Sequence, residues 1–285
     1  MTFLEGKQFI LQSILHHYDQ RESTNIAGFV MEWITGMSKI DFAINKSSIL
    51  LPHQIDMVYS FSKRLEQGEP MQYVLEEAWF MGNRFKVSKD TLIPRPETEE
   101  LVTWILQDLH NNENQLLHLI DIGTGSGCIP ISIQLKYNNA AILAIDISRN
   151  ALAIAQENAL MHKQRVEFKE LDFLDETAWV ELKPVNIIVS NPPYIKELEK
   201  NAMHRNVLNF EPHQALFVPD EDALLFYRKI MLFSKSHLLS GGFIYLEINE
   251  ALSEELVTLF LSDYELIELK KDIYGKDRML RIKKI

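Results

Sequence analysis

The stretch Val185-Asn186-Ile187-Ile188-Val189-Ser190-Asn191-Pro192-Pro193-Tyr194 joins a short β-branched run to an asparagine and two prolines. Such a run is typical of a strand buried on both faces, so residues 185–189 predict a strand of an α/β sheet. Proline can neither donate to a sheet ladder nor continue a helix. We therefore expect Asn191 to lie just beyond the carboxyl end of the strand, on a stiff segment.

The polar groups after this strand suit a planar NH2 group. We expect the Asn191 side-chain oxygen and the Pro192 carbonyl to accept one hydrogen each, which turns the nitrogen lone pair toward a reagent on the other side. The ring of Tyr194 would press against the planar group. An Asn-Pro turn that only ends a strand explains these letters alone about as well, and it is the other motifs of the chain that favour chemistry.

Strands and helices alternate from Leu116 onward, which predicts an open parallel sheet with helices on both faces. A turn between the last two apolar runs predicts a hairpin that adds one antiparallel strand. The predicted strands are Leu117–Ile122, Ala141–Ile145, Val166–Leu171, Val185–Val189, Gly242–Ile248, Tyr264–Leu269 and Met279–Ile285. The predicted helices begin after Gly127, at Ser148, at Asp222 and at Leu252.

The loops after the first three strands carry nucleoside-binding signals. The turn Gly123-Thr124-Gly125-Ser126-Gly127 lets a ligand approach the main chain closely. Asp146 ends the second strand 19 residues after Gly127, where an acid can accept both hydroxyls of a ribose. Asp172 and Phe173 follow the third strand and would hold the edge and face of an adenine.

The dinucleotide fingerprint G-x-G-x-x-G is not present, because Cys128 occupies the place of its third glycine. We therefore expect the close helix packing that this glycine permits to be missing, which favours a nucleoside without a pyrophosphate. Cys128 itself is interpreted as a small packing residue rather than an activated thiol.

The segment before the sheet predicts a helical module over residues 4–68, from its apolar stripes at helical spacing. Two aromatic runs around Gly82-Asn83 then predict a β-hairpin with a two-residue loop. Pro96 is well placed to start a helix. Physical reasoning from sequence gives Arg95 no role.

Composition limits the class of protein. The 285 residues carry 29 Lys and Arg against 40 Asp and Glu, a formal net charge of −11, which disfavours a general binder of duplex DNA or of membrane surfaces. The single cysteine excludes an intrachain disulfide and a cysteine-based zinc cluster. The sequence shows neither a secretory signal nor an apolar run of membrane-spanning length, and we expect a cytoplasmic protein without a bound metal.

Three motifs together resemble the HemK-type release factor glutamine methyltransferases. They are Ile93-Pro94-Arg95-Pro96-Glu97-Thr98-Glu99, Asp121-Ile122-Gly123-Thr124-Gly125-Ser126-Gly127 and Asn191-Pro192-Pro193-Tyr194. The last motif is shared with adenine-N6 and other amino methyltransferases, whereas the first is much more specific. The resemblance runs nearly end to end.

This resemblance implies a Rossmann-like class I methyltransferase sheet after a small helical domain. The implied domains are an N-terminal substrate-recognition domain (1–75), a β-hairpin linker (76–92) and a methyltransferase domain (93–285). The implied reaction moves a methyl group from S-adenosyl-L-methionine, leaving S-adenosyl-L-homocysteine, to the amide nitrogen (N5) of the glutamine in the Gly-Gly-Gln loop of peptide chain release factors. The implied partners are these release factors, with no direct DNA binding and no membrane.

The resemblance also implies roles for individual residues. The glycine turn would hold the methionine part of the cofactor, Asp146 the ribose and Phe173 the adenine, with Asn191 beside them. Asn191, Pro192, Pro193 and Tyr194 would grip the glutamine. The cofactor-binding residues are thus Gly123, Thr124, Gly125, Ser126, Gly127, Asp146, Phe173 and Asn191, and the catalytic residues are Asn191, Pro192 and Tyr194. We expect no general base, because the methylated nitrogen is acidic enough to lose its proton after transfer.

Two stretches depart from the family pattern, and two other functions stay open. The chain has Phe210-Glu211-Pro212 where the family often has Tyr-Glu-Pro, and residues 217–222 replace a glycine-rich segment. One alternative is an adenine-N6 methyltransferase acting on nucleic acid, although no basic recognition segment is evident. The other is an inactive methyltransferase fold that serves as a binding module.

Overall fold

The computed structural model describes residues 1–110, 116–261 and 264–285. Their contacts group the chain into two compact units. One unit comprises residues 1–77 and 204–210, and the other comprises residues 78–203 and 211–285.

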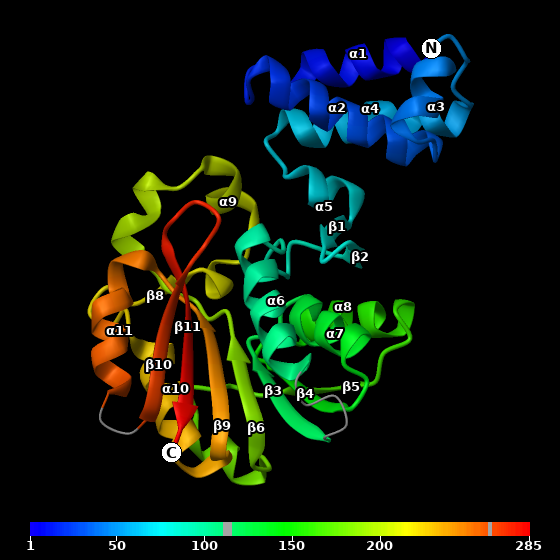
Figure 1. The fold of residues 1–285 in the computed structure, drawn as a ribbon. Helices are drawn as coiled ribbons and strands as arrows, with labels where there is room; N and C mark the ends of the chain where they lie inside the picture. Colours follow the sequence, from blue (N-terminus) through cyan, green and yellow to red (C-terminus); the bar gives the residue numbers. More distant parts are fainter. Residues whose placement is uncertain (111–115, 262–263) are drawn as a thin grey trace. The chain divides into compact units, whose positions relative to one another are not determined.

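The smaller unit is helical, as its apolar periodicity predicts. Apolar side chains from three helices, among them Ile10, Val30 and Val58, are fully buried in its core, and these helices lie side by side (Figure 1). Thr2 and Ser38 cap helices by accepting backbone N–H groups. The helices are α1 (Phe3–Ile14), α2 (Gln20–Thr35), α3 (Lys39–Ile44), α4 (Pro52–Glu66), α5 (Met71–Leu75) and the short α9 (Arg205–Phe210).

A β-hairpin follows, formed by β1 (Glu77–Phe80) and β2 (Asn83–Lys86). Its two-residue loop is Met81-Gly82 rather than the predicted Gly82-Asn83. Both loop residues have positive φ, 51° at Met81 and 74° at Gly82, which is the conformation that matches the twist of a tight hairpin. The prediction was wrong by one residue because a methionine rarely adopts this backbone conformation.

The larger unit contains a seven-stranded sheet in the order β10-β11-β9-β6-β3-β4-β5. Only β11 runs antiparallel to its neighbours β9 and β10, so the predicted mixed sheet with one antiparallel strand is confirmed. The strands are β3 (Leu117–Ile122), β4 (Ala140–Asp146), β5 (Val166–Glu170), β6 (Val185–Ser190), β9 (Leu238–Glu247), β10 (Tyr264–Lys271) and β11 (Asp277–Lys284).

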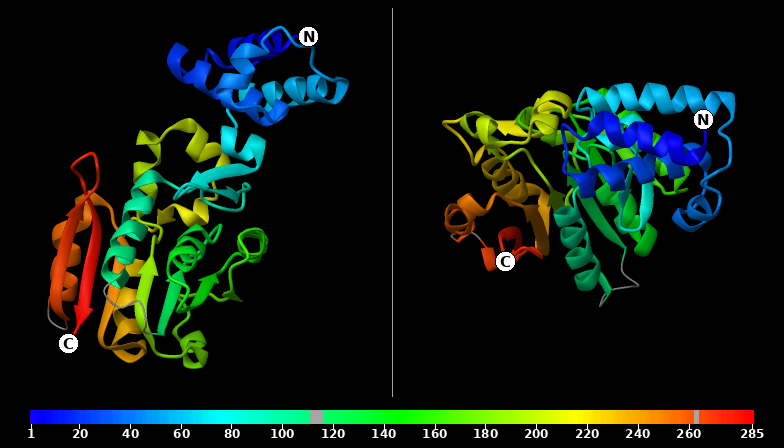
Figure 2. Two further views of the ribbon diagram at one scale, coloured as in Figure 1. Left: turned by 45° about the vertical axis from the view of Figure 1, so that its right-hand side comes forward. Right: turned by 90° about the horizontal axis from the view of Figure 1, so that it is seen from above.

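Helices cover both faces of this sheet, because its central strands bury alternate side chains on opposite sides. In β6, Ile187 and Val189 face one core while Ile188 faces the other. The first core is closed by α6 (Pro96–His110), α7 (Cys128–Lys136) and α8 (Arg149–Met161); the second is closed by η1 (Glu176–Glu181), α10 (Leu225–His237) and α11 (Ser253–Phe260). Figure 2 shows the β10–β11 hairpin at one edge of the sheet.

The loops that follow the parallel strands meet at the carboxyl edge of the sheet. The Ser190 hydroxyl donates to the Ile122 carbonyl at 2.7 Å, which ties the end of β6 to the end of β3. Short elements complete this edge, namely β7 (Ile195–Lys196), η2 (Glu197–Ala202), η3 (His213–Ala215), β8 (Phe217–Val218) and η4 (Glu250–Leu252). Within the described ranges, no helix combines the length and apolar character needed to cross a membrane.

Candidate active site

A cavity of about 520 Å³ opens at the carboxyl edge of the sheet, within the larger unit. This volume suits a small molecule of nucleoside size or larger. Eight of the residues to which the sequence assigned a binding role line it, contributed by the ends of β3, β4, β5 and β6. They are Gly123, Gly125, Asp146, Asp172, Phe173, Asn191, Pro192 and Pro193.

The glycine turn gives this cavity an open main-chain wall. Gly123 and Gly125 have φ of 76° and 54°, and a Cβ at either position would meet nothing within 4 Å, so the space above their backbone is free for a ligand. Thr124, Ser126 and Gly127 belong to the same turn but are not among the described residues that line the cavity.

Gly127 serves packing rather than the cavity. Its φ is 77°, and a Cβ there would lie 3.0 Å from the Cβ of Ala155 on α8 and 3.1 Å from Ile131 Cδ1. The close helix approach that we expected to be missing is therefore present, one residue earlier than in the dinucleotide fingerprint. The prediction that no glycine provides this close packing was wrong, because the spacing of the glycines does not reveal which of them faces α8.

Asp146 holds the glycine turn and the start of α8 together. Its Oδ2 accepts the Gly125 N–H and its Oδ1 accepts the Ser148 N–H, each at 2.8 Å. Burial raises the pKa of the Asp146 carboxyl, and these backbone donors oppose that shift. Each carboxylate oxygen can still accept a second hydrogen bond from a ligand in the cavity.

Phe173 is only 5% exposed and lines the cavity from the end of β5. The centroid of its ring lies 5.3 Å from that of Trp179 and 5.4 Å from that of Phe233. The Trp179 indole N–H donates to the Phe173 carbonyl at 3.0 Å. An aromatic cluster therefore fixes the orientation of this ring.

Asp121 is a buried acid that sequence reasoning did not single out by itself. It precedes the cavity-lining Ile122 on β3 and is completely buried, and no described group makes a hydrogen bond to either carboxylate oxygen. Burial raises the pKa of the Asp121 carboxyl to about 7, while the nearby Thr124 hydroxyl opposes the shift and Asp146 adds to it. A cation bound in the cavity would favour the ionised form.

Asn191 and Tyr194 are joined by two buried residues that the sequence did not reveal, Thr98 and Glu247. Asn191 Nδ2 donates to Thr98 Oγ1 at 3.2 Å, and the Thr98 hydroxyl donates to Glu247 Oε2 at 2.6 Å. The Tyr194 hydroxyl donates to Glu247 Oε1 at 3.2 Å, and Tyr194 is not among the described lining residues. One feature of the sequence could have pointed to Glu247: it lies at the end of a predicted strand, and parallel strands place their ends at the same edge of the sheet as Asn191.

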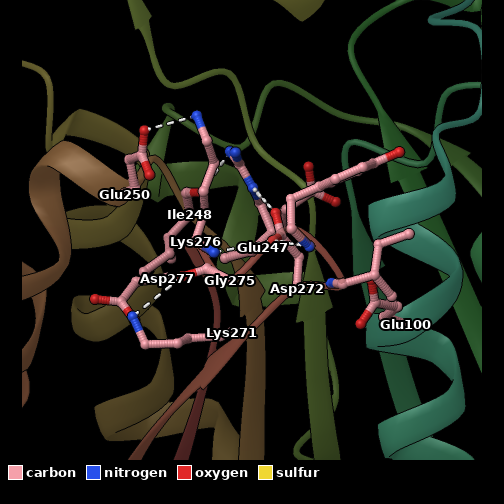
Figure 3. Close-up of polar contacts among 12 residues, drawn as sticks. Glu100, Glu247, Ile248, Glu250, Lys271, Asp272, Gly275, Lys276 and Asp277 are labelled. Atoms are coloured by element: carbon pink, nitrogen blue, oxygen red, sulfur yellow. Dashed lines mark hydrogen bonds and ion pairs between the residues drawn. The ribbon is translucent and has the colours of Figure 1, made fainter.

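The turn between β10 and β11 carries Asp272, which is drawn together with Glu247 in Figure 3, and is followed by Arg278. Asp272 is 6% exposed and accepts the Tyr274 and Lys276 N–H groups, which fixes the turn. Arg278 donates to the Ile248 carbonyl at 3.2 Å and to Asp272. Burial raises the pKa of Glu247, and the charge of Arg278 opposes that shift.

Arg95, to which the sequence gave no role, forms an ion pair with Glu211. The Glu211 carboxylate is buried and also accepts the Ile93 N–H at 3.3 Å. The segment before α6 is thus fastened to Glu211, and the next residue, Pro212, lines the cavity. The departure at Phe210 leaves this ion pair intact.

Cys128 behaves as the predicted packing residue. It is buried at the start of α7, and burial raises the pKa of its thiol to about 12, so the thiol stays protonated at neutral pH.

Comparisons with known proteins find methyltransferases among the relatives of this chain. The family model described as "Methyltransferase small domain" matches residues 102–213. The "Release factor glutamine methyltransferase" of Flavobacterium psychrophilum is 41% identical over 277 residues, which cover 96% of each chain. That of Bacteroides thetaiotaomicron is 38% identical over 273 residues, 95% of this chain and 96% of the relative.

A solved structure shares the fold at low sequence identity. The Thermus thermophilus 16S rRNA N2 G1207 methyltransferase, in complex with AdoMet and guanosine, superposes with a TM-score of 0.50 at 15% identity. The match covers 73% of this chain and 50% of that one.

Identity at this level over nearly the whole length, together with the three motifs at one edge of the sheet, shows that the chain belongs to the release factor glutamine methyltransferase family.

Proposed function

We propose that this protein transfers a methyl group from S-adenosylmethionine to the side-chain amide nitrogen of the glutamine in the Gly-Gly-Gln loop of peptide chain release factors. The observation that carries the proposal is one shared cavity. The Asn191-Pro192-Pro193 wall, with its acceptors for a planar NH2 group, borders the same space as Gly123 and Asp146, which suit a nucleoside.

The residues present fit the cofactor. S-adenosylmethionine carries an ammonium and a sulfonium. Asp121 does not line the cavity itself, but it lies next to the lining residue Ile122, and its carboxyl oxygens have no hydrogen-bonded partner in the described chain. Gly123 and Gly125 would hold the methionine part, Asp146 would accept ribose hydroxyls, and Phe173 would contact the adenine. When bound, the cofactor supplies an activated methyl group with its leaving group already in place.

The task left to the protein is to aim a weak nucleophile. An amide nitrogen is weak because its lone pair is delocalised. Asn191 Oδ1 and the Pro192 carbonyl would each accept one hydrogen of the glutamine NH2, which directs the remaining face of the nitrogen into the cavity. Pro192 and Pro193 keep this segment stiff, so little ordering is needed when substrate arrives. No side chain is assigned as a base.

The helical unit formed by α1 to α5 is the part of the chain that we propose recognises the release factor. We keep the boundaries predicted from the sequence, with recognition in residues 1–75, a linker in 76–92 and methyl transfer in 93–285. The net charge of −11 makes a protein substrate more suitable than nucleic acid.

Methyl transfer from labelled cofactor tests the proposal. The protein is incubated with S-adenosylmethionine labelled in the methyl group, a release factor and ribosomal RNA, and protein is then separated from nucleic acid. We expect label only in the release factor, and none with Asn191→Ala. Label in RNA would support an adenine-N6 methyltransferase instead, and no labelling together with no cofactor binding would support an inactive binding module.

A further inference from the structure

We infer that Thr98 and Glu247 are positioning residues that determine which end of the Asn191 amide faces the cavity. The inference rests on the proposed function, because it concerns how Asn191 meets a substrate amide. An asparagine side chain has an acceptor oxygen at one end and a donor NH2 at the other, in nearly the same shape. Only one orientation offers an acceptor to a substrate NH2 group.

The order of donors and acceptors runs outward from Glu247. A carboxylate only accepts, so the Thr98 hydroxyl gives its single proton to Glu247 Oε2, at 2.6 Å. Thr98 Oγ1 then has only lone pairs left for Asn191, and it accepts from Asn191 Nδ2 at 3.2 Å. The NH2 group is thereby held toward Thr98, which leaves Oδ1 as the polar atom that Asn191 offers to the cavity it lines.

Tyr194 strengthens this order from the other side of the carboxylate. Its hydroxyl donates to Glu247 Oε1 at 3.2 Å, so both oxygens of Glu247 accept from a residue of the site. Burial raises the pKa of the Tyr194 hydroxyl, which therefore stays a donor. Thr98 is 3% and Glu247 2% exposed, so water does not replace a lost partner in this network.

The order depends on Glu247 being ionised, because a protonated carboxyl would carry a donor of its own. Burial raises the pKa of Glu247, and Glu97 on α6 adds to the shift. Arg278 on β11 and the hydroxyls of Thr98 and Tyr194 oppose it, while the Tyr227 hydroxyl on α10 donates to the Glu247 backbone carbonyl at 3.0 Å. Protonation as the pH falls would loosen the amide.

Variants of Thr98 provide the main test, with kcat and KM measured for the release factor and cofactor affinity measured by titration. Thr98→Val keeps the shape but removes the hydroxyl, and Thr98→Ser restores it. We expect Thr98→Val to lower kcat/KM by about 10- to 100-fold, the cost of one misplaced hydrogen bond to a buried group. Cofactor affinity should stay near wild type, and Thr98→Ser should recover most of the activity.

The pH profile provides a second, independent test. We expect kcat/KM of wild type to fall at acidic pH as Glu247 is protonated. Glu247→Gln has no group to protonate there, so we expect its profile to lack this acidic limb. The matched control is Glu250→Gln, the same change three residues further on, where the carboxylate pairs with Lys276 at the surface (Figure 3). This variant should keep the wild-type profile.

Three outcomes would overturn the inference while the proposed function stands. They are a methylating wild type whose Thr98→Val variant has unchanged kcat/KM, a Thr98→Ser variant as impaired as Thr98→Val, or the same acidic limb in wild type and Glu247→Gln. A folded wild type that binds the cofactor but does not methylate release factor would instead contradict the proposed function itself.

Discussion

Replacing Asp146 by asparagine should weaken cofactor binding through two losses at once. The carboxylate accepts the Gly125 and Ser148 N–H groups at 2.8 Å each. Asparagine has one acceptor oxygen, so its NH2 must face one of these two donors. The second loss is at the ribose, whose hydroxyls would meet a neutral amide instead of a carboxylate, and losing one hydrogen bond to a charged acceptor costs about 1.5–3 kcal/mol. We therefore expect the Kd for S-adenosylmethionine to rise by about 10- to 150-fold.

Isothermal titration with S-adenosylmethionine measures this change, and urea unfolding of the unliganded protein shows whether the fold is retained. Asp175→Asn is the matched control, because Asp175 also accepts a backbone N–H, from Thr177 at 3.0 Å, but does not line the cavity. It should bind the cofactor like wild type. A folded Asp146→Asn protein with wild-type affinity would refute both the ribose role and the support of the glycine turn.

Three further predictions concern stability. Gly127→Ala should lower the free energy of unfolding, measured in urea, by about 2–4 kcal/mol, because alanine is strained at a positive φ and its Cβ would press against α8. Gly241→Ala is the control: its φ is 74° and the space around it is open, so it should lose only the backbone strain of about 1–2 kcal/mol. Equal losses in the two variants would contradict the packing role of Gly127. Burial raises the pKa of Asp121 to about 7 in the folded protein, so the folded state binds this proton more tightly than the unfolded state. The free energy of unfolding of the unliganded wild type should therefore rise as the pH falls from about 8 to about 4, by up to about 4 kcal/mol relative to Asp121→Asn. Parallel curves of unfolding free energy against pH for the two proteins, measured in urea, would contradict the raised pKa of Asp121. Glu211→Gln should lose about 1–3 kcal/mol, because one of the Arg95 and Ile93 donors loses its acceptor, and an unchanged urea midpoint would contradict this.

The sheet was predictable from sequence because its signals are local. Strands β3 and β6 are short β-branched or apolar runs that end at turn residues, and the structure places them within a residue of the prediction. Helix α10 begins at Leu225, three residues after the predicted start at Asp222. The preceding residues form turns instead, with the Asp222 N–H donating to the Pro219 carbonyl at 3.0 Å.

The cavity-lining part of the site was also predictable, since each motif sits at the end of one strand and parallel strands end at one edge. Arg95, Thr98 and Glu247 were not. Thr98 contacts a residue 149 positions away, and Arg95 a residue 116 positions away, so neither pairing leaves a pattern in one sequence. Their partners become evident only when the fold brings β9 and the segment around Glu211 beside α6.

The position of the transferred methyl group tests the central proposal most directly. A release factor is incubated with the protein and S-adenosylmethionine, digested, and examined by tandem mass spectrometry. We predict one added methyl group, on the side-chain nitrogen of the Gly-Gly-Gln glutamine, and none when Asn191 is replaced by alanine. A methyl group on any other residue, or an unmodified glutamine after incubation with protein that binds the cofactor, would contradict the proposal.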